Sequence, residues 1–426
     1  MVRVARVVRV VPYRARVLTP YRDLLATPGG RRFSGAAFVA RMPIAMVNLG
    51  IVLLVVAENG SYGLAGAISA AFALVNAVSA PVIARLIDRR GQRRVLAPAV
   101  ALHSVGLGLF VVLVSSGAPT WSLYLSAAAA GLFGPSIGSL VRARWGHALG
   151  PGARLRTAYA FESVLDELIF VVGPLVVTVL ATRFFPAAGL LGAAGLVVVG
   201  TLALLSHRSS EPPAAAHDAP HPSALRSPGL VTLMAVMAFV GGVFGSVEIS
   251  AVAFADESGR RVLAGPLLAS YAGGSMLSGL AFGAVTWKVS ARRRLLLGAA
   301  VMTATVTTLP WTDSAGVLAG LLFLAGVGIA PTLISGFSLV ERMVPTSNVT
   351  EGLTWATTGL IVGFSAATWL AGRLVDTAGV GEAFLVAPAS GLCALAVCGT
   401  VYRRLPPGDH PCAPTDASRV GRTVGG

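Results

Sequence analysis

Residues 84–94 read ARLIDRRGQRR, a short charged stretch between two long apolar runs. The runs before and after it cover residues 61–84 and 95–116. Each is long enough to cross the hydrocarbon core of a bilayer as a helix, which takes about 20 apolar residues. Gly91 permits a tight turn between two helix ends, and the arginines around it favour the cytoplasmic side of a membrane. The stretch therefore predicts a cytoplasmic loop between two membrane-spanning helices.

The same alternation of apolar runs and charged turns continues along the chain and predicts an all-α integral membrane protein with twelve transmembrane helices. Lipid offers no partner to free backbone groups, so a spanning segment is either a helix or a strand of a closed barrel. The runs are too long and too continuous for barrel strands. We expect the helices at residues 33–57, 61–84, 95–116, 120–141, 157–181, 184–206, 228–250, 263–287, 294–312, 315–340, 351–375 and 381–402.

The composition agrees with a chain embedded in lipid. Of its 426 residues, 55% are hydrophobic and 12% are charged, whereas soluble domains carry roughly 25% charged residues. The net charge of +15 would suggest nucleic acid in a soluble protein, but here the charges fall between the apolar runs. We therefore predict the lipid bilayer, and no nucleic acid, as a partner. The three cysteines match no metal or disulfide pattern; they are Cys393, Cys398 and Cys412.

The distribution of basic residues predicts which helix ends face the cytoplasm. With a cytoplasmic N-terminus, 28 of the 33 Lys and Arg residues fall in cytoplasmic segments, as the positive-inside rule requires. We therefore expect a multi-pass protein of the bacterial inner membrane with both termini in the cytoplasm. Arg41 lies within the first helix, and the four basic residues of the outside loops are Arg183, Arg260, Arg261 and Arg373.

A polar, proline-rich segment at residues 207–227 divides the chain into two sets of six predicted helices. The sets resemble each other, because the second helix opens with Leu-Ala-Gly at 64–66 and the eighth opens with the same residues at 263–265. We predict a basic cytoplasmic N-tail at 1–32, six-helix bundles at 33–206 and 228–404, the cytoplasmic linker at 207–227, and a cytoplasmic C-tail at 405–426.

Residues 84–94 resemble the signature loop of the major facilitator superfamily: Gly, three residues, Asp, Arg, any residue, Gly, any residue, Arg, Arg. Ala84 replaces the first glycine, and the matching residues are Asp88, Arg89, Gly91, Arg93 and Arg94. The resemblance implies the major facilitator fold, two six-helix bundles with substrate near the midplane between them. It also implies that the loop is a conformational latch, in which Asp88 approaches the start of the eleventh helix near 350–351. The alternative is an ordinary basic loop that only sets the topology.

Ionisable residues inside a predicted helix are candidate functional groups, because each costs roughly 2.5–3.5 kcal/mol to insert at the centre of the membrane. The fifth helix holds Glu162, Asp166 and Glu167, the first two on one face. Like charges this close raise one another's pKa, which suits a proton carrier. The alternative is a structural ion pair near the cytoplasmic end, with Arg41 or with the arginines at 154 and 156.

Two further groups of residues extend the list of candidates. Gly173-Pro174 resembles an element of the fifth helix in drug antiporters of this superfamily, although mid-helix Gly-Pro also simply bends a helix. Glu248 in the seventh helix faces either the cavity or water, and Glu351 favours the start of the eleventh helix. Candidate cavity residues, with interhelical packing or hydrogen bonding as their alternative role, are Asn48, Asn76, Tyr271 and Trp355.

The sequence contains no nucleotide-binding loop, metal-ligand cluster or nucleophile–base pair in a recognisable setting, so we predict no enzyme activity, no cofactor and no metal. The function predicted first is secondary active transport by alternating access, with proton-coupled export of a hydrophobic or drug-like small molecule by a monomer. The alternative is uptake of a sugar or organic acid by symport or facilitated diffusion. A non-transporting membrane sensor or scaffold is the alternative from another class.

Overall fold

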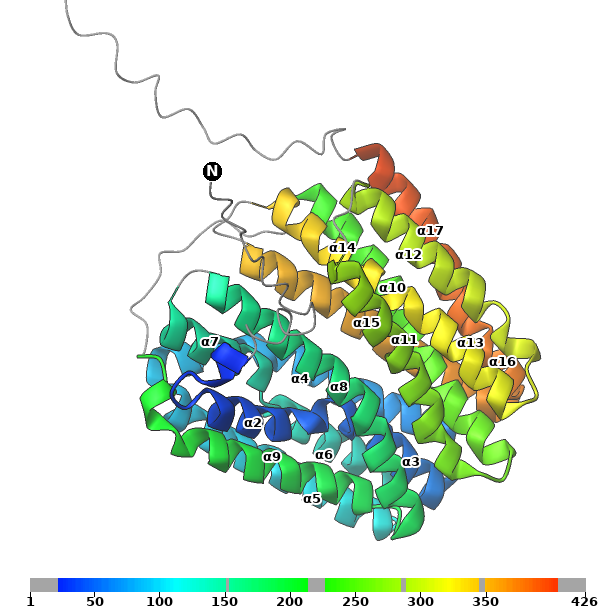
Figure 1. Ribbon diagram of the computed structural model, residues 1–426. Helices are drawn as coiled ribbons and strands as arrows, with labels where there is room; N and C mark the ends of the chain where they lie inside the picture. The colour runs from blue at the N-terminus through cyan, green and yellow to red at the C-terminus, as the bar shows by residue number, and fades with distance from the viewer. Residues whose placement is uncertain (1–21, 151–152, 214–226, 285–288, 345–348, 405–426) are drawn as a thin grey trace, which may run out of the picture.

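The structure is a computed structural model that describes residues 22–150, 153–213, 227–284, 289–344 and 349–404. Its regular elements in these ranges are all helices, which lie side by side along a common direction (Figure 1). Ten of them are long and apolar enough to cross a membrane. The prediction of an all-α membrane fold is therefore confirmed.

The helices of the first half pack together. The elements are α2 (Gly30–Arg41), η1 (Met42–Ala45), α3 (Val47–Asn59), α4 (Tyr62–Arg90), α5 (Gln92–Ser115), α6 (Thr120–Leu132), α7 (Ile137–Leu149), α8 (Ala153–Arg183), α9 (Ala188–Ser206) and η2 (Arg208–Ser210).

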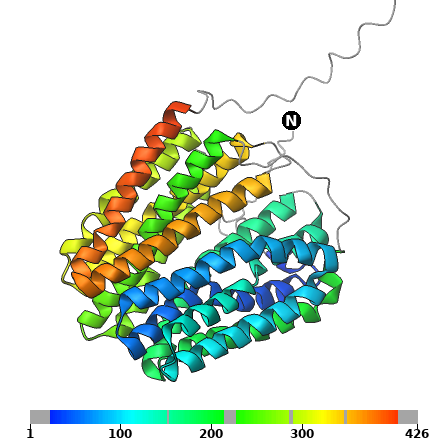
Figure 2. The same ribbon diagram turned by 180° about the vertical axis from the view of Figure 1, so that it is seen from behind.

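The helices of the second half form a corresponding group. They are α10 (Pro228–Glu257), η4 (Arg261–Leu263), α11 (Ala264–Ala284), α12 (Ala291–Val306), η5 (Leu309–Trp311), α13 (Ala315–Val327), α14 (Ile329–Met343), α15 (Val349–Thr377), α16 (Val380–Phe384) and α17 (Val386–Arg404). In Figures 1 and 2 this group lies beside the first, and α4 packs against α15 while α8 packs against α11.

Two predicted spans are helical but fall outside the ten helices that meet the membrane criterion, namely α11 and α12. The described part of α11 contains five glycines and three serines, which lower its hydropathy. Helix α12 has 16 residues, and the turn that follows it leads into η5 rather than continuing the span. Both helices still leave large apolar side chains exposed, among them Leu277 on α11 and Leu297 on α12, as the lipid-facing helices around them do.

Four predicted spans are each divided into two helices. The first is interrupted by η1 around Pro43, the fourth between α6 and α7 around Gly134-Pro135, the tenth at Gly328, and the twelfth at Leu385 between α16 and α17. Proline lacks the N–H that continues a helix. In the second of these breaks the carbonyl of Gly131 accepts a hydrogen bond from Asn76 Nδ2 at 3.1 Å. Broken helices are tolerated at membrane depth where neighbours satisfy the freed backbone in this way.

Glycine lets the helices of the second half touch backbone to backbone. A Cβ built on Gly363 would lie 1.6 Å from the carbonyl oxygen of Ala238, and one on Gly241 would lie 1.9 Å from that of Leu360. Helices α10 and α15 could not pack this closely with larger residues at these positions. Membrane helices commonly use small residues for such contacts.

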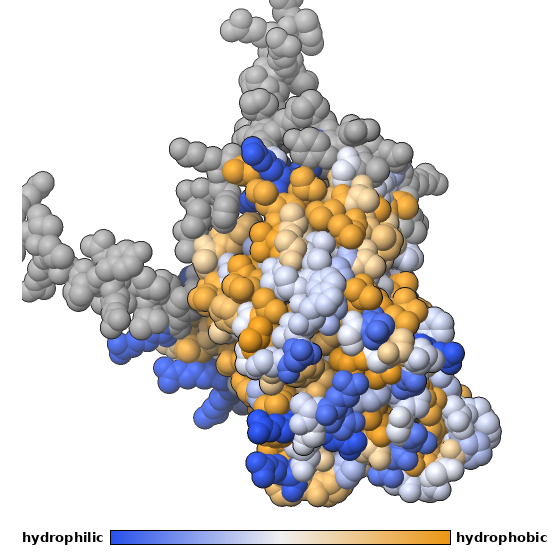
Figure 3. Space-filling view, turned by 90° about the vertical axis from the view of Figure 1, so that its right-hand side faces the viewer, coloured by the Kyte–Doolittle hydropathy of each residue, from blue (hydrophilic) through white to orange (hydrophobic). Residues whose placement is uncertain are grey.

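Large apolar side chains remain exposed along the helices, as expected for surfaces in contact with lipid. Val78, Val105 and Val199 are exposed by 72%, 67% and 63%. A soluble protein seldom leaves so many on one surface. Figure 3 shows the side on which α13 and α16 lie in Figure 1, where hydrophilic side chains lie among apolar ones.

The helices share two ends, which position the sites described next. We call one the distal end, where α8, α10 and α15 finish and α4 begins. We call the other the terminal end, where α2 begins and α4 turns into α5. Residues 22–29, within the predicted N-tail, are partly packed there: Leu24 is buried, and Arg154 Nη2 donates to Thr27 Oγ1 at 3.1 Å.

Candidate functional site

A network of charged side chains lies inside the first half. Arg41, at the end of α2, contacts Glu162 through Nη2 and donates from Nη1 to Asp166 Oδ1 at 2.7 Å. Arg142 Nη2 donates to the other oxygen of Asp166, also at 2.7 Å. The side chains of Arg41 and Glu162 are fully buried, whereas that of Asp166 is 31% exposed.

The remaining oxygen of Glu162 is also occupied. Glu162 Oε1 accepts hydrogen bonds from Ser34 Oγ at 2.5 Å and from Trp145 Nε1 at 2.7 Å. A buried ion pair whose polar atoms are all satisfied is strongly held, and removal of one partner costs about 3–5 kcal/mol. The structure thus brings together Arg41, Glu162 and Asp166 of the predicted group, in a geometry that resists a change of charge. The second arginine is Arg142, which was not among the predicted partners.

Two other candidate carboxylates lack such partners. Glu248 Oε1, on α10, is buried and has no hydrogen-bond partner among the residues that the structure describes. Glu167 is half-buried on α8, and its side chain makes no hydrogen bond or ion pair with any residue that the structure describes. Glu167 shares a face with Pro174 and Thr178, which lie against Gly265 of α11. Glu167 is therefore on the side of α8 that meets the second half.

The other candidates mostly form local contacts. Asn48 Oδ1 accepts from Ser69 Oγ at 3.2 Å, which ties α3 to α4. Trp355 Nε1 donates to Glu351 Oε1 at 3.4 Å within the first turns of α15. Asn76 supports the break after α6, as described above. Helix α8 continues through Gly173-Pro174, and Gly173 lies against Ala45 of η1.

Tyr271 differs from these residues because its hydroxyl is buried and finds no hydrogen-bond partner in the described part of the chain. Its ring meets that of Phe244 edge-on, with 6.1 Å between the ring centroids. Phe244 is one turn before Glu248 on the same face of α10. Tyr271 therefore lies beside the part of α10 that carries the unpaired carboxylate.

The signature loop forms the tight turn that its glycine predicts. Gly91 has a φ of +86°, a conformation that favours glycine, and it ends α4 and begins α5. The side chains of Arg89, Arg93 and Arg94 are exposed. The side chain of Asp88 lies outside the described residues, so the latch with α15 stays a prediction.

Two residues that sequence analysis did not single out hold this loop in place. Arg144 is fully buried and donates from Nε to Gln92 Oε1 at 2.8 Å. Its Nη1 donates to the carbonyls of Leu204 and His207 at 2.9 and 3.0 Å and to Ser210 Oγ at 2.9 Å. Glu211 Oε1 accepts from the backbone N–H of Arg93 at 3.1 Å.

Arg144 therefore ties the end of α9 and the start of the linker to the signature loop. In the sequence it was one of several arginines after the fourth apolar run. At the end of an apolar run, the sequence does not distinguish an arginine that sets the topology from one that is buried in the fold.

At the distal end, a residue of the second half caps a helix of the first. The carboxylate of Asp376, on α15, accepts hydrogen bonds from the backbone N–H groups of Tyr62 and Gly63, both at 2.8 Å. It also accepts from Ser61 Oγ at 2.8 Å. Free N–H groups and the helix dipole make a helix N-terminus a favourable place for an anion.

A second connection lies beside the first. Tyr62 donates from its hydroxyl to Asp256 Oδ2 at 2.9 Å, and Arg261 binds both oxygens of Asp256. The hydrogen bond to Asp256 raises the pKa of the Arg261 guanidinium, so it stays charged. We call Ser61, Tyr62, Gly63, Asp256 and Asp376 the distal clasp.

Close helix packing surrounds the distal clasp. A Cβ built on Gly372 would lie 2.4 Å from the carbonyl oxygen of Tyr62, and one on Gly66 would lie 2.6 Å from that of Thr368. Asp376 was not among the predicted site residues, although two signals were present. Ser61 is a good N-cap residue before the second helix, and Asp376 is an acidic residue at the end of the eleventh.

No cluster that could hold a metal appears in the described part of the chain, where three or more His, Cys, Asp or Glu side chains nowhere converge. The carboxylate of Glu248 can change its protonation, and the distal clasp can change the contact between the two halves.

Comparison with known proteins gives one family. The sequence profile described as Major Facilitator Superfamily matches residues 33–315 and 249–420, which together cover most of the chain. No curated protein matches the sequence.

Solved structures share the fold at low sequence identity. An auto-inhibited peptide transporter of the POT family has a TM-score of 0.67 at 13% identity, over 88% of this chain and 97% of that one. A variant of the nucleoside transporter NupG has a TM-score of 0.70 at 11% identity, over 88% of this chain and 99% of that one. At these identities the likeness concerns the fold alone.

Proposed function

Since the chain belongs to the Major Facilitator Superfamily, it is a secondary transporter in the membrane and not an enzyme, and we propose that it exports a hydrophobic small molecule in exchange for protons. We place it as a monomer in a bacterial inner membrane, with the terminal end in the cytoplasm and the distal end outside. The charge distribution supports this orientation.

The observation that carries the proposal is Glu248, whose Oε1 is buried without a hydrogen-bond partner among the described residues. A proton carrier has to gain and lose its charge during the cycle, so a permanent positive partner would oppose it. Glu162 and Asp166 each have such a partner in Arg41. Glu248 has none, and we assign it the coupling role and the Arg41 network a structural one.

The surroundings of Glu248 support an apolar substrate. Phe244 and Tyr271 meet edge-on beside it, and the hydroxyl of Tyr271 has no protein partner. A site of mostly apolar and aromatic side chains with one or two polar groups is typical for small molecules. Sugar sites usually carry several Asn and Gln side chains, and α10 and α11 contain neither.

Alternating access requires contacts between the halves that form in one state and break in the other. The distal clasp is such a contact, because Asp376 and Asp256 come from the second half and residues 61–63 from the first. With the distal end outside, the structure corresponds to a state closed toward the outside. Opening would separate Asp376 from the start of α4.

Transport in proteoliposomes tests the coupling role. A pH-sensitive dye inside the vesicles reports proton flux while cationic dyes, antibiotics, sugars and organic acids are added outside under an imposed pH gradient. Peptides and nucleosides, which two similar structures transport according to their descriptions, belong in the same screen.

We expect Glu248→Gln to abolish substrate-dependent proton flux while substrate exchange across the membrane continues. Glu257→Gln, at the exposed end of the same helix, is the matched control and should behave as the unmodified protein. Proton flux that persists in Glu248→Gln would refute the assignment. Substrate exchange without any proton flux in the unmodified protein would refute proton coupling altogether.

A further inference from the structure

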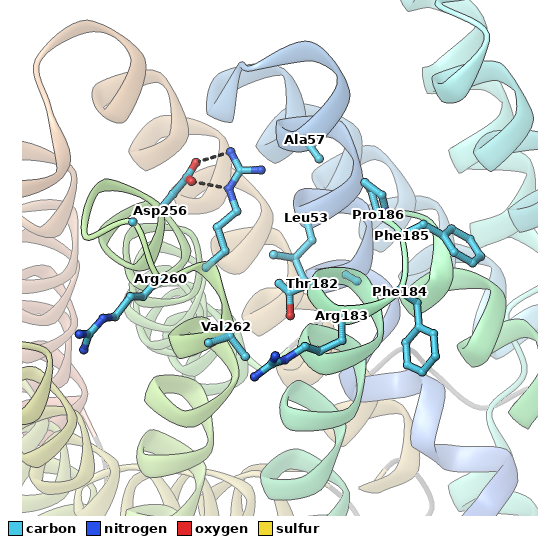
Figure 4. A pocket seen from close by; sticks show the side chains of 13 residues that line it. Leu53, Ala57, Thr182, Arg183, Phe184, Phe185, Pro186, Asp256, Arg260 and Val262 are labelled. Carbon is cyan, nitrogen blue, oxygen red and sulfur yellow. Dashed lines mark hydrogen bonds and ion pairs between the residues drawn. The ribbon is translucent and has the colours of Figure 1, made fainter.

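A pocket with a volume of about 830 Å³ lies at the distal end between the two halves. Leu53 and Ala57 of α3 and residues 181–186 at the end of α8 line it from the first half. Asp256 and residues 259–262 line it from the second. Figure 4 shows the ion pair of Asp256 on one side of the pocket and Phe184 and Phe185 on the other. The pocket is therefore formed by both halves together.

The pocket is lined by arginines from outside loops, where arginine is uncommon. Arg183, Arg260 and Arg261 all line it. They are three of the four basic residues that the sequence places outside the membrane, in loops that the positive-inside rule depletes of such residues. These arginines come from loops 77 residues apart in sequence, so their convergence on one pocket is a tertiary feature.

The positive charge of the pocket is largely uncompensated. Asp256 is the acidic residue among its lining residues, and Arg261 binds it. The side chains of Arg183 and Arg260 are exposed, and neither makes a hydrogen bond or ion pair with any residue within the described ranges. Arg183 belongs to the first half and Arg260 to the second, so each half contributes one free guanidinium.

The rest of the lining is apolar. Leu53, Ala57 and Val262 face the pocket from both halves, and Phe184 is 71% exposed at its rim. Guanidinium groups bind phosphate and carboxylate through paired hydrogen bonds. The combination fits a ligand with an anionic head and an apolar body.

We propose that this pocket binds an anionic amphiphile, with its phosphate or carboxylate group held between Arg183 and Arg260. Such a ligand bridges the two halves and removes the repulsion between two like charges. It binds the state in which the distal clasp is closed and loses its site when the halves part. A ligand that binds one state more tightly shifts the equilibrium toward that state. The size of the shift is set by the ratio of its affinities for the two states. This effect of the ligand does not depend on which molecule is transported or on the direction of transport.

Binding to the full-length protein in nanodiscs of phosphatidylcholine tests the site. The probes are decyl phosphate, inorganic phosphate, and phosphatidylglycerol mixed into the disc, each followed by calorimetry or by competition with radiolabelled decyl phosphate. Competition by phosphatidylglycerol identifies a lipid headgroup as a source of the ligand, and competition by inorganic phosphate identifies a free anion. Both outcomes support the site.

The double variant Arg183→Gln and Arg260→Gln should lower the affinity for decyl phosphate at least about tenfold, since each loses a charge-assisted hydrogen bond. Both side chains are exposed, so the fold should be retained, which size-exclusion chromatography checks. Arg373→Gln removes the same charge from the fourth outside arginine, which does not line the pocket, and should bind normally. The proposal is wrong if no probe binds saturably, or if the double variant binds as tightly as the control.

A distance measurement tests the linkage separately. Spin labels at Glu58→Cys and Ser258→Cys, exposed positions in the two halves near the pocket, report the separation of the distal ends after the three native cysteines are replaced by alanine. Saturating decyl phosphate should increase the share of the short distance. An unchanged distribution with bound probe would overturn the bridging role.

Discussion

Replacement of Asp376 by asparagine should weaken the distal clasp and open the distal end. The carboxylate accepts two backbone hydrogen bonds from the start of α4 and one from Ser61. Because Asp376 is exposed, the values for surface helix caps apply rather than those for buried ions. Loss of a cap costs about 0.5–2 kcal/mol, and loss of a charge at the helix dipole about 0.3–1 kcal/mol.

The amide of asparagine retains one acceptor oxygen, so we expect a net loss of about 1–2 kcal/mol for the closed state. This corresponds to a change of about 5–30-fold in the ratio of closed to open molecules. Pulsed electron spin resonance between labels at positions 58 and 258 in nanodiscs measures both populations directly. The expected result is a distinct increase of the long-distance population.

Asp313→Asn is the matched control. Asp313 is an exposed aspartate that follows η5 in the second half, and its side chain makes no hydrogen bond or ion pair with the residues that the structure describes. Equal distance distributions in Asp376→Asn and Asp313→Asn would refute the reasoning, because the cap would then contribute nothing to closure.

Three further predictions concern the rest of the structure. Glu162→Gln leaves Arg41 with an incomplete set of partners and should destabilise the protein by about 3–5 kcal/mol, seen as a lower unfolding temperature in detergent. Gly363→Ala should separate α10 from α15 and lower the yield of folded protein, whereas Gly195→Ala, which has open space around it, should not; equal yields would contradict the packing argument. Arg144→Gln should speed amide hydrogen exchange at residues 204–211, and unchanged exchange would show that the linker start is held by other contacts.

The membrane spans could be predicted from the sequence because they depend on a local property. Twenty consecutive apolar residues partition into lipid wherever they occur in a chain. The breaks at Pro43 and Gly328 were not predicted, because a break depends on residues that are distant in the sequence. A helix break is tolerated or not according to what its neighbours offer the freed backbone groups, as Asn76 does for Gly131.

The candidate site was predictable in part. The spacing of Glu162 and Asp166 places them on one face of a helix, and Arg41 was a plausible partner for both. The sequence could not distinguish a proton carrier from an ion pair, because that choice depends on whether Arg41 reaches the carboxylates. Glu248 was one of several acidic candidates until its burial without a partner set it apart.

The sequence by itself determined that the chain is a helical membrane protein, because hydropathy, charge distribution and the signature loop are readable from residues that are near one another. Only the tertiary structure decided which distant residues meet. Asp376 caps a helix that begins more than 300 residues earlier, and Arg183 and Arg260 share one pocket. These pairings follow from how the two halves dock, and docking depends on the shape of whole helix faces rather than on any local pattern.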